Sequence, residues 1–144
     1  MSKLKNTPFY HEAFNELNYS FGSFFLFETF IVAEINEDVV FNWEEHGKLA
    51  SKDISSLYGN NGKDLIYLTN RINQYAVQPS DWLNFYKNSF KLKGYGIINY
   101  TKTGYFNNIL EKIFTSSNFR SFTSLEDAII WAKHTTNIRS SKAS

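Results

Sequence analysis

The sequence predicts a single α/β domain with a mixed, mostly parallel sheet, an antiparallel N-terminal hairpin at the sheet edge and about four helices. Three observations support this prediction. Dense apolar and aromatic runs of strand length open the chain, helical periodicity begins near residue 42, and strand-like and helical segments alternate from there onward. Strand–helix–strand connections of this length favour parallel neighbours joined by right-handed crossovers.

The N-terminal part of the chain predicts the antiparallel edge. Residues 14–21 alternate incompletely between apolar and polar side chains, as an edge strand does. Residues 24–27 and 30–35 are denser in apolar side chains and predict two buried strands joined by a tight turn at Glu28–Thr29, with one bent strand as the alternative. We expect residues 1–12 to form a flexible N-terminus.

The first helix is predicted to follow the hairpin. Asn42 and Glu45 have the spacing of a capping box, and apolar side chains then recur at helical intervals until Gly59, which can end a helix in the left-handed conformation. Residues 60–64 form a turn by composition. The compact apolar run at residues 64–70 then predicts a strand in the centre of the sheet.

Two more helices are predicted before the last strand. Pro79 suits the first turn of a helix over residues 79–90, because its missing N–H would have no intrahelical partner there. Residues 92–100 predict the next strand. Thr103 can cap a further helix, in which a buried stripe would consist of Phe106, Ile109, Leu110 and Ile113.

The C-terminal part predicts a last strand and a last helix. The strand covers residues 118–122, and Thr123 with Glu126 forms a capping box at the start of the helix. Residues 135–144 have little to bury, so we expect a flexible tail. Residues 13–134 would then form the domain, because a chain of 144 residues is too short for two comfortable domains.

Composition limits the partners and the compartment. The formal net charge of +1 gives no field that would select nucleic acid, and the longest apolar runs are far too short to span a membrane. The chain has no Cys, which excludes disulfides and thiolate chemistry and fits a reducing compartment. We therefore expect a cytoplasmic protein that neither binds nucleic acid nor inserts into a membrane.

No residue pattern predicts an active site. The three His residues are scattered without ligand-like spacing, so we expect no metal site. An acidic cluster near the first strand-to-helix connection could hold a catalytic carboxylate pair, although a solvated helix cap is the simpler interpretation. Its members are Glu34, Glu37, Asp38, Glu44 and Glu45. We expect neither an enzyme nor a bound cofactor.

The segment after the central strand, with the helix that follows it, holds the candidate binding residues. It lies at the C-terminal end of a parallel strand, where open α/β sheets usually place their sites. Its amides, its cation and its aromatic rings are residue types that populate recognition surfaces. The candidate partner-binding residues are Asn70, Arg71, Asn73, Gln74, Tyr75 and Trp82. The alternative is a polar loop whose Arg side chain pairs with a carboxylate or caps a helix.

The junction between the last strand and the last helix carries a short motif. Residues 122–128 read Phe-Thr-Ser-Leu-Glu-Asp-Ala, and Trp131 follows. Together with the N-terminal hairpin and the strand–helix alternation over residues 14–133, this motif resembles the SpoIIAA-like branch of the STAS superfamily. The resemblance implies a STAS-like fold and a non-catalytic regulatory function exerted on a protein partner.

The best-known members of that family are bacterial anti-sigma-factor antagonists. Phosphorylation of a Ser in an Asp-Ser-Ser-Gly-like sequence at the start of a helix regulates them. This chain has no such sequence, so we do not expect the usual phosphoswitch. Ser80 is a candidate phosphoacceptor at a predicted helix N-terminus, where added negative charge is favoured, and an ordinary place in the first helical turn is the alternative.

A carrier or sensor of a small apolar ligand is the alternative function. The SpoIIAA-like branch is often grouped with lipid-binding Sec14-like domains, and the resemblance extends this function to the chain. The 14 Phe and nine Tyr residues could line an apolar pocket, although they also suit plain core packing. A homodimer is a further prediction, because an uncovered edge strand at residues 14–21 would favour self-association.

Overall fold

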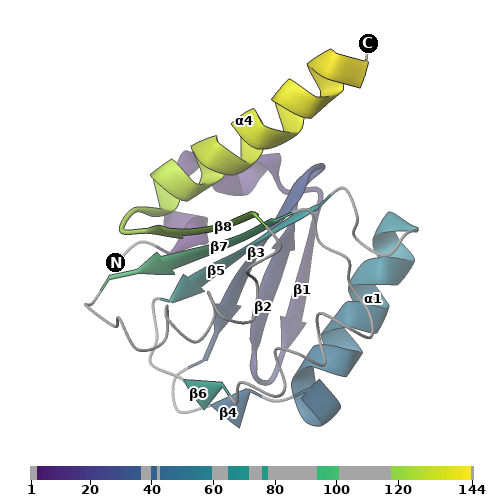
Figure 1. The fold of residues 1–144 in the computed structure, drawn as a ribbon. Helices are drawn as coiled ribbons and strands as arrows, with labels where there is room; N and C mark the ends of the chain where they lie inside the picture. The colour runs from purple at the N-terminus through teal and green to yellow at the C-terminus, as the bar shows by residue number, and fades with distance from the viewer. Residues whose placement is uncertain are drawn as a thin grey trace.

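A six-stranded mixed sheet lies at the centre of the structure (Figure 1). The computed structural model describes residues 3–36, 40–41, 43–59, 65–71, 76–77, 94–100 and 118–143. In spatial order the strands of the sheet are β1 (Asn15–Tyr19), β2 (Gly22–Leu26), β3 (Phe30–Ile35), β5 (Ile66–Arg71), β7 (Gly94–Asn99) and β8 (Asn118–Phe122). The first three are antiparallel, whereas β3, β5, β7 and β8 are parallel. The predicted α/β class with a mixed sheet and an antiparallel N-terminal hairpin is confirmed.

The antiparallel part consists of separate strands. β2 and β3 pair with Leu26 opposite Ile31, so the chain turns at Glu28–Thr29 as predicted and does not form one bent strand. β1 lies at the edge of the sheet and is mostly half-buried, as its incomplete alternation indicated. A separate parallel pair consists of β4 (Val40–Phe41) and β6 (Ala76–Val77).

Two α-helices lie within the described residues, on opposite faces of the sheet (Figure 1). α1 (Lys48–Tyr58) follows a π-helical turn, η3 (Trp43–Gly47), and ends where Gly59 adopts the predicted left-handed conformation with a φ of 71°. α4 (Leu125–Ala143) follows β8. The other two of the four predicted helices lie outside the described residues, over 79–90 and from 103 onward.

The two faces of the sheet bury separate apolar clusters. Side chains alternate between the faces along each strand, so the apolar run at residues 30–33 of β3 serves both clusters, and all six β3 residues are buried. On one face, which we call the α1 face, Ala50 and Ile54 of α1 complete the cluster. On the other, the α4 face, the contribution of α4 consists of Leu125, Ala128, Ile129 and Ala132.

The N-terminal segment, residues 4–12, covers part of the α4 face. It forms two 3₁₀ helices, η1 (Leu4–Asn6) and η2 (Pro8–Glu12), and the Leu4 side chain is fully buried in the α4-face cluster. This placement differs from the expected flexible N-terminus. The physical reason is that Leu4 anchors the segment, although the charged and polar residues around it in the sequence gave no sign of burial.

α4 extends beyond the predicted domain. Its helical backbone continues to Ala143, through residues that we expected to form a flexible tail from residue 135 onward. The stretch contains neither Gly nor Pro, so no residue type in it interrupts the helical hydrogen-bond ladder. The helix that burial stabilises in the first half of α4 therefore continues into a polar sequence that has no strong helix preference of its own.

Replacement of Gly22 by Ala should lower stability through the backbone. Gly22 opens β2 with a φ of +157°, and a Cβ atom there would lie 2.6 Å from the Glu34 carbonyl oxygen. We expect Gly22→Ala to lower the free energy of unfolding by about 3 kcal/mol, from strain and overpacking together. Gly59→Ala is the control, because a Cβ at Gly59 meets nothing within 4 Å and only conformational strain of about 1 kcal/mol applies. Urea denaturation measures both, and equal losses would contradict this account.

Candidate functional site

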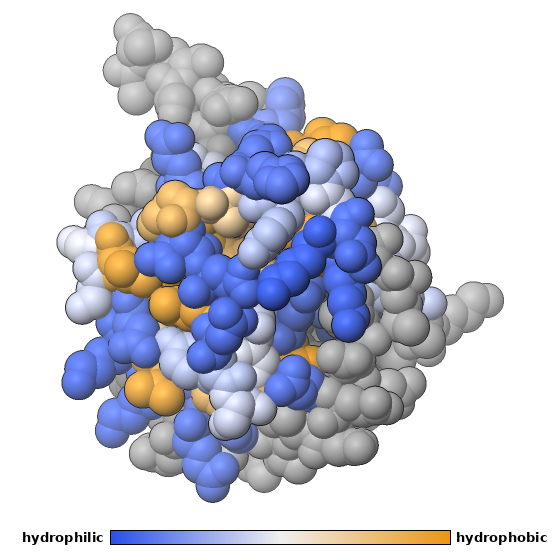
Figure 2. Space-filling model, turned by 180° about the vertical axis from the view of Figure 1, so that it is seen from behind, coloured by the Kyte–Doolittle hydropathy of each residue, from blue (hydrophilic) through white to orange (hydrophobic). Residues whose placement is uncertain are grey.

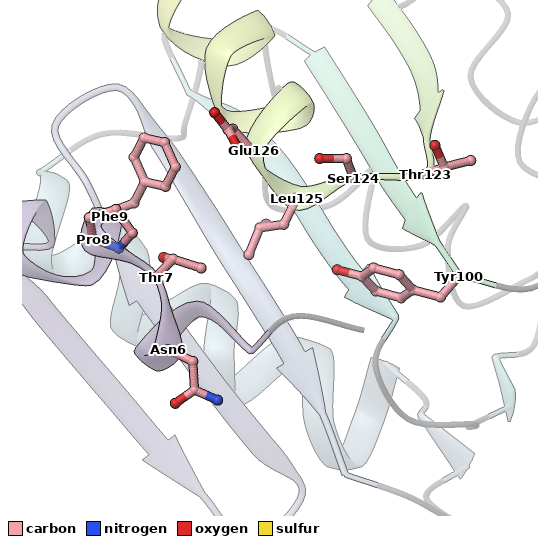
Figure 3. A pocket seen from close by; sticks show the side chains of 9 residues that line it. All are labelled: Asn6, Thr7, Pro8, Phe9, Tyr100, Thr123, Ser124, Leu125 and Glu126. Carbon is pink, nitrogen blue, oxygen red and sulfur yellow. The ribbon is translucent and has the colours of Figure 1, made fainter.

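A cavity of about 440 Å³ opens between the N-terminal segment and the start of α4 (Figure 3). Its lining residues are Asn6, Thr7, Pro8, Phe9, Tyr100, Thr123, Ser124, Leu125 and Glu126. Tyr100 directly follows β7 and Thr123 directly follows β8, so the cavity lies at the carboxyl ends of two parallel strands. Open α/β sheets place their ligand sites at this edge, and the volume is that of a small-molecule site.

The β8–α4 junction forms one wall of the cavity. The side-chain oxygen of Ser124 accepts a hydrogen bond from the Asp127 N–H at 3.4 Å, and the Ser124 carbonyl accepts one from the Ala128 N–H at 3.2 Å. Ser124 is therefore the N-cap of α4, and the predicted capping by Thr123 is wrong by one residue. This shift leaves Thr123 exposed beside the cavity.

The cavity lining mixes polar and apolar groups. Figure 3 shows Thr7 and Phe9 on one side, Tyr100 and Ser124 on the other, and the Leu125 side chain pointing into the space between them. Hydroxyl groups therefore face the same space as two aromatic rings. Such a lining suits a ligand with an apolar body and polar groups better than the purely apolar ligand expected from composition.

A buried hydrogen-bond network lies behind the cavity. The Glu34 carboxylate, at the end of β3, accepts hydrogen bonds from the Leu4 N–H and the Asn70 side-chain amide, each at 2.8 Å and both on Oε2. The Tyr100 hydroxyl donates to Asn70 Oδ1 at 2.7 Å. These four residues, which we call the buried network, join the ends of three adjacent parallel strands to the N-terminal segment. Tyr100 connects the network to the cavity lining.

Burial dominates the electrostatics of Glu34. The side chain is removed from water, which raises the pKa of its carboxyl group above the ordinary value of 4.5. The hydrogen bonds from Leu4 and Asn70 act in the opposite direction, as do the positive charges of Lys3 and Lys5. Desolvation is the larger effect, so the burial of Glu34 lowers the stability of the fold, and the hydrogen bonds from the two donors reduce this loss.

The buried position of Glu34 differs from the solvated helix cap that the sequence suggested. Glu45 of the same acidic cluster is exposed, whereas Glu37 and Asp38 lie outside the described residues. The signal that could have distinguished Glu34 is strand periodicity. Glu34 is two residues from Val32, so both side chains point to the α4 face, where Val32 is fully buried.

The predicted partner-binding residues divide into two groups. Asn70 is fully buried and belongs to the network, so within the described residues it acts inside the molecule. Arg71, the last residue of β5, is half-buried, and strand alternation directs it toward the α1 face. The remaining candidates lie outside the described residues: Asn73, Gln74, Tyr75, Trp82 and the candidate phosphoacceptor Ser80.

Sequence reasoning missed the N-terminal side of the cavity and Tyr100. Tyr100 had a usable signal, because it follows β7 at the same carboxyl edge at which Asn70 was selected on β5. Asn6, Thr7 and Phe9 had none, because no local pattern indicates that a segment before the first strand returns to the end of the sheet.

The described part of the chain offers little for other kinds of site. Among these residues no three His, Asp or Glu side chains are grouped as a metal ion would require. No helix there has both the length and the apolar character needed to cross a membrane. Figure 2 shows a mainly hydrophilic face on which apolar residues form separate spots, so this face offers no broad apolar surface, and the predicted homodimer stays a prediction.

Glu34 should make stability depend on pH in a defined direction. Because the pKa of Glu34 is raised in the folded state, its contribution to the free energy of unfolding is fully present below pH 4.5 and is lost as the pH rises through the raised value. Glu34→Gln removes this titration. The free energy of unfolding of the variant should therefore improve relative to that of the wild type as the pH increases from about 4 to about 8. Urea denaturation over a pH series measures the difference, and an opposite trend would mean that the donors outweigh desolvation.

Comparison of the chain with models of known protein families, with curated proteins and with solved structures finds no match.

Proposed function

We propose that this chain is a non-catalytic regulatory module that binds a small molecule in the cavity between the N-terminal segment and α4. The observation that carries the proposal is the attachment of Tyr100 to the buried network. Because a buried amide holds the Tyr100 hydroxyl, the Tyr100 ring lies in a fixed orientation beside the cavity. Such preorganisation lowers the entropic cost of binding a ligand.

The ligand that suits this cavity is uncharged and has both an apolar and a polar part. Phe9, Leu125 and Tyr100 offer apolar contacts, and the hydroxyls of Thr7 and Thr123 offer polar ones. The N-terminus of α4 would favour an anion, but the acidic first turn, Glu126 and Asp127, offsets this partial charge. The proposed ligand therefore differs from the purely apolar molecule suggested by composition.

The absence of catalysis is part of the proposal. Among the described lining residues the carboxylate is that of Glu126, which is exposed, and Glu34 does not line the cavity. Proton transfer to a bound molecule needs an acid or base within hydrogen-bond reach and with a suitable partner. The described lining is better suited to binding than to bond breaking.

The SpoIIAA-like resemblance supplies a second part of the proposal. It is supported by an antiparallel start that leads into parallel strands in chain order, and by the Phe122 to Trp131 motif at the β8–α4 junction. A cytoplasmic regulator of this kind would act on a protein partner, without the usual Ser phosphoswitch. Ser80 stays a candidate phosphoacceptor under this hypothesis.

A partner-binding surface at the end of β5 is the route by which such a module could act. Asn70 belongs to the buried network, and the next residue, Arg71, leads into residues 72–75, so a change at Tyr100 could reach that segment through one amide.

The Arg71→Ala, Tyr75→Ala double variant should lose a protein partner that the wild type captures from extract of its own cells. Unchanged capture would remove this surface from the proposal.

The cavity can be tested with three small probes that share a phenyl ring and differ in charge: benzyl alcohol, benzylamine and benzoate. We expect benzyl alcohol to bind with a Kd on the order of millimolar, and the two charged probes to bind more weakly. Chemical-shift changes in nuclear magnetic resonance spectra would locate the binding at Tyr100 and Leu125. Tighter binding of benzoate would instead indicate an anion site at the start of α4.

A matched pair of variants ties the binding to the cavity. Phe9→Ala should weaken benzyl alcohol binding by about fivefold, because it removes a ring from the lining. Phe14→Ala is the control, since Phe14 is 55% exposed and packs on Tyr58 away from the cavity. Equal effects of the two substitutions, or no shift at the lining residues with any probe, would contradict the proposed function.

A further inference from the structure

We propose that the N-terminal segment is a strap that opens and closes the cavity, with the Leu4 side chain as its latch. This inference concerns the regulation of the proposed ligand site and rests on the proposed function. It starts from the position of the segment, which contributes Asn6, Thr7, Pro8 and Phe9 to the lining while Tyr100 and the start of α4 form the other side (Figure 3). Displacement of the segment would therefore remove one side of the cavity.

The segment is attached to the domain differently from the strands. Its backbone hydrogen bonds are largely internal 3₁₀ bonds, such as those from Asn6 to Lys3, from Thr7 to Leu4 and from Ala13 to Tyr10. Strand pairing begins only at Phe14, whose N–H donates to the Leu26 carbonyl. The segment can therefore lift from the α4 face without breaking any strand pair, with its hinge near Ala13.

Leu4 is the one fully buried side chain of the segment, and the half-buried rings of Phe9 and Tyr10 pack against the same cluster. The Leu4 N–H donates to Glu34. The Tyr10 hydroxyl also donates to Glu16 at 2.6 Å.

The ion pairs Lys5–Glu16 at 3.1 Å and Glu12–Lys133 at 2.5 Å join long side chains that are largely exposed, Glu16 excepted, and such pairs contribute little to stability. A short segment with a single fully buried side chain and no strand pairing opens locally, at a free energy well below that of global unfolding.

The latch and the cavity share the buried network. Glu34 Oε2 accepts both the Leu4 N–H and the Asn70 amide, and Asn70 Oδ1 accepts the Tyr100 hydroxyl. When the latch opens, Glu34 loses a donor and gains water. A ligand that contacts both Tyr100 and Phe9 binds the closed state better than the open state, so it must shift the strap toward closure.

Thiol labelling can measure the opening of the strap, because the chain has no Cys of its own. Leu4→Cys places one thiol at the latch, and Leu68→Cys places one on β5 in the same apolar cluster, where the native side chain is equally buried. We expect N-ethylmaleimide to label Leu4→Cys at least about tenfold faster than Leu68→Cys, after both rates are corrected for the unfolded fraction. Equal corrected rates would mean that the segment opens only with the whole domain, which would overturn the inference.

Hydrogen exchange of the unmodified protein makes the same comparison with Leu4 intact. The amides of residues 4–12 should exchange at least about tenfold faster than those of β5 under identical conditions. Exchange of both regions at one common rate, set by global unfolding, would overturn the inference even if Leu4→Cys were poorly folded.

Addition of benzyl alcohol separates failure of this inference from failure of the proposed function. If the probe binds at Tyr100 and slows the labelling of Leu4→Cys, the strap controls the cavity. If the probe binds there and the labelling rate is unchanged, the inference fails while the ligand site stands. If the probe does not bind, both the proposed function and the control of a ligand site by the strap are contradicted. The labelling comparison then still decides whether the segment opens on its own.

Discussion

A carboxylate buried at the end of a strand persists only where donors surround it, and Glu34 meets this condition by bringing separate parts of the chain together. β3 supplies the carboxylate, β5 supplies the Asn70 amide, and the N-terminal segment supplies a backbone N–H. Loss of either donor would leave a buried charge short of a partner, so the positions of these elements depend on one another. Tyr100, and with it one side of the cavity, is held through the same amide.

The strand order explains why the cavity lies on the α4 face. α1 connects β3 to β5, its parallel neighbour, and a right-handed crossover of this kind fixes the face on which the helix lies. α4 follows β8 and connects no pair of strands in the described sheet, so it is free to cover the opposite face (Figure 1). It covers that face together with the N-terminal segment, and the space between these two elements at the carboxyl edge of the sheet is the cavity.

The sequence was sufficient for the features that local chemistry decides. The apolar runs placed the six strands of the sheet, Gly59 placed the end of α1, and the turn at Glu28–Thr29 placed the hairpin. It was insufficient where distant contacts decide. Nothing near Leu4 in the sequence indicates that it is buried, and the choice between Thr123 and Ser124 as the N-cap depends on where β8 ends.

The candidate site shows the same division. Asn70 could be selected as a polar residue at the end of a central strand, but its role inside the network depends on Glu34, 36 residues away, and on Tyr100, 30 residues away. Glu34 looked like part of a solvated acidic cluster because Glu37 and Asp38 follow it closely in the sequence. Its neighbours in space are an amide and a backbone N–H, and only the fold brings them to it.

The chain order of the strands also has a consequence for biosynthesis. The six strands of the sheet lie side by side in the order in which they occur in the chain, and β4 and β6 form a separate pair. The sheet can therefore grow by addition of strands at one edge while the polypeptide leaves the ribosome. The cluster that receives Leu4, however, is completed by Leu125, Ala128, Ile129 and Ala132 of α4. Leu4 is translated well before α4, so it reaches its final place only after α4 has been made, and the nascent chain carries an unburied leucine throughout that interval.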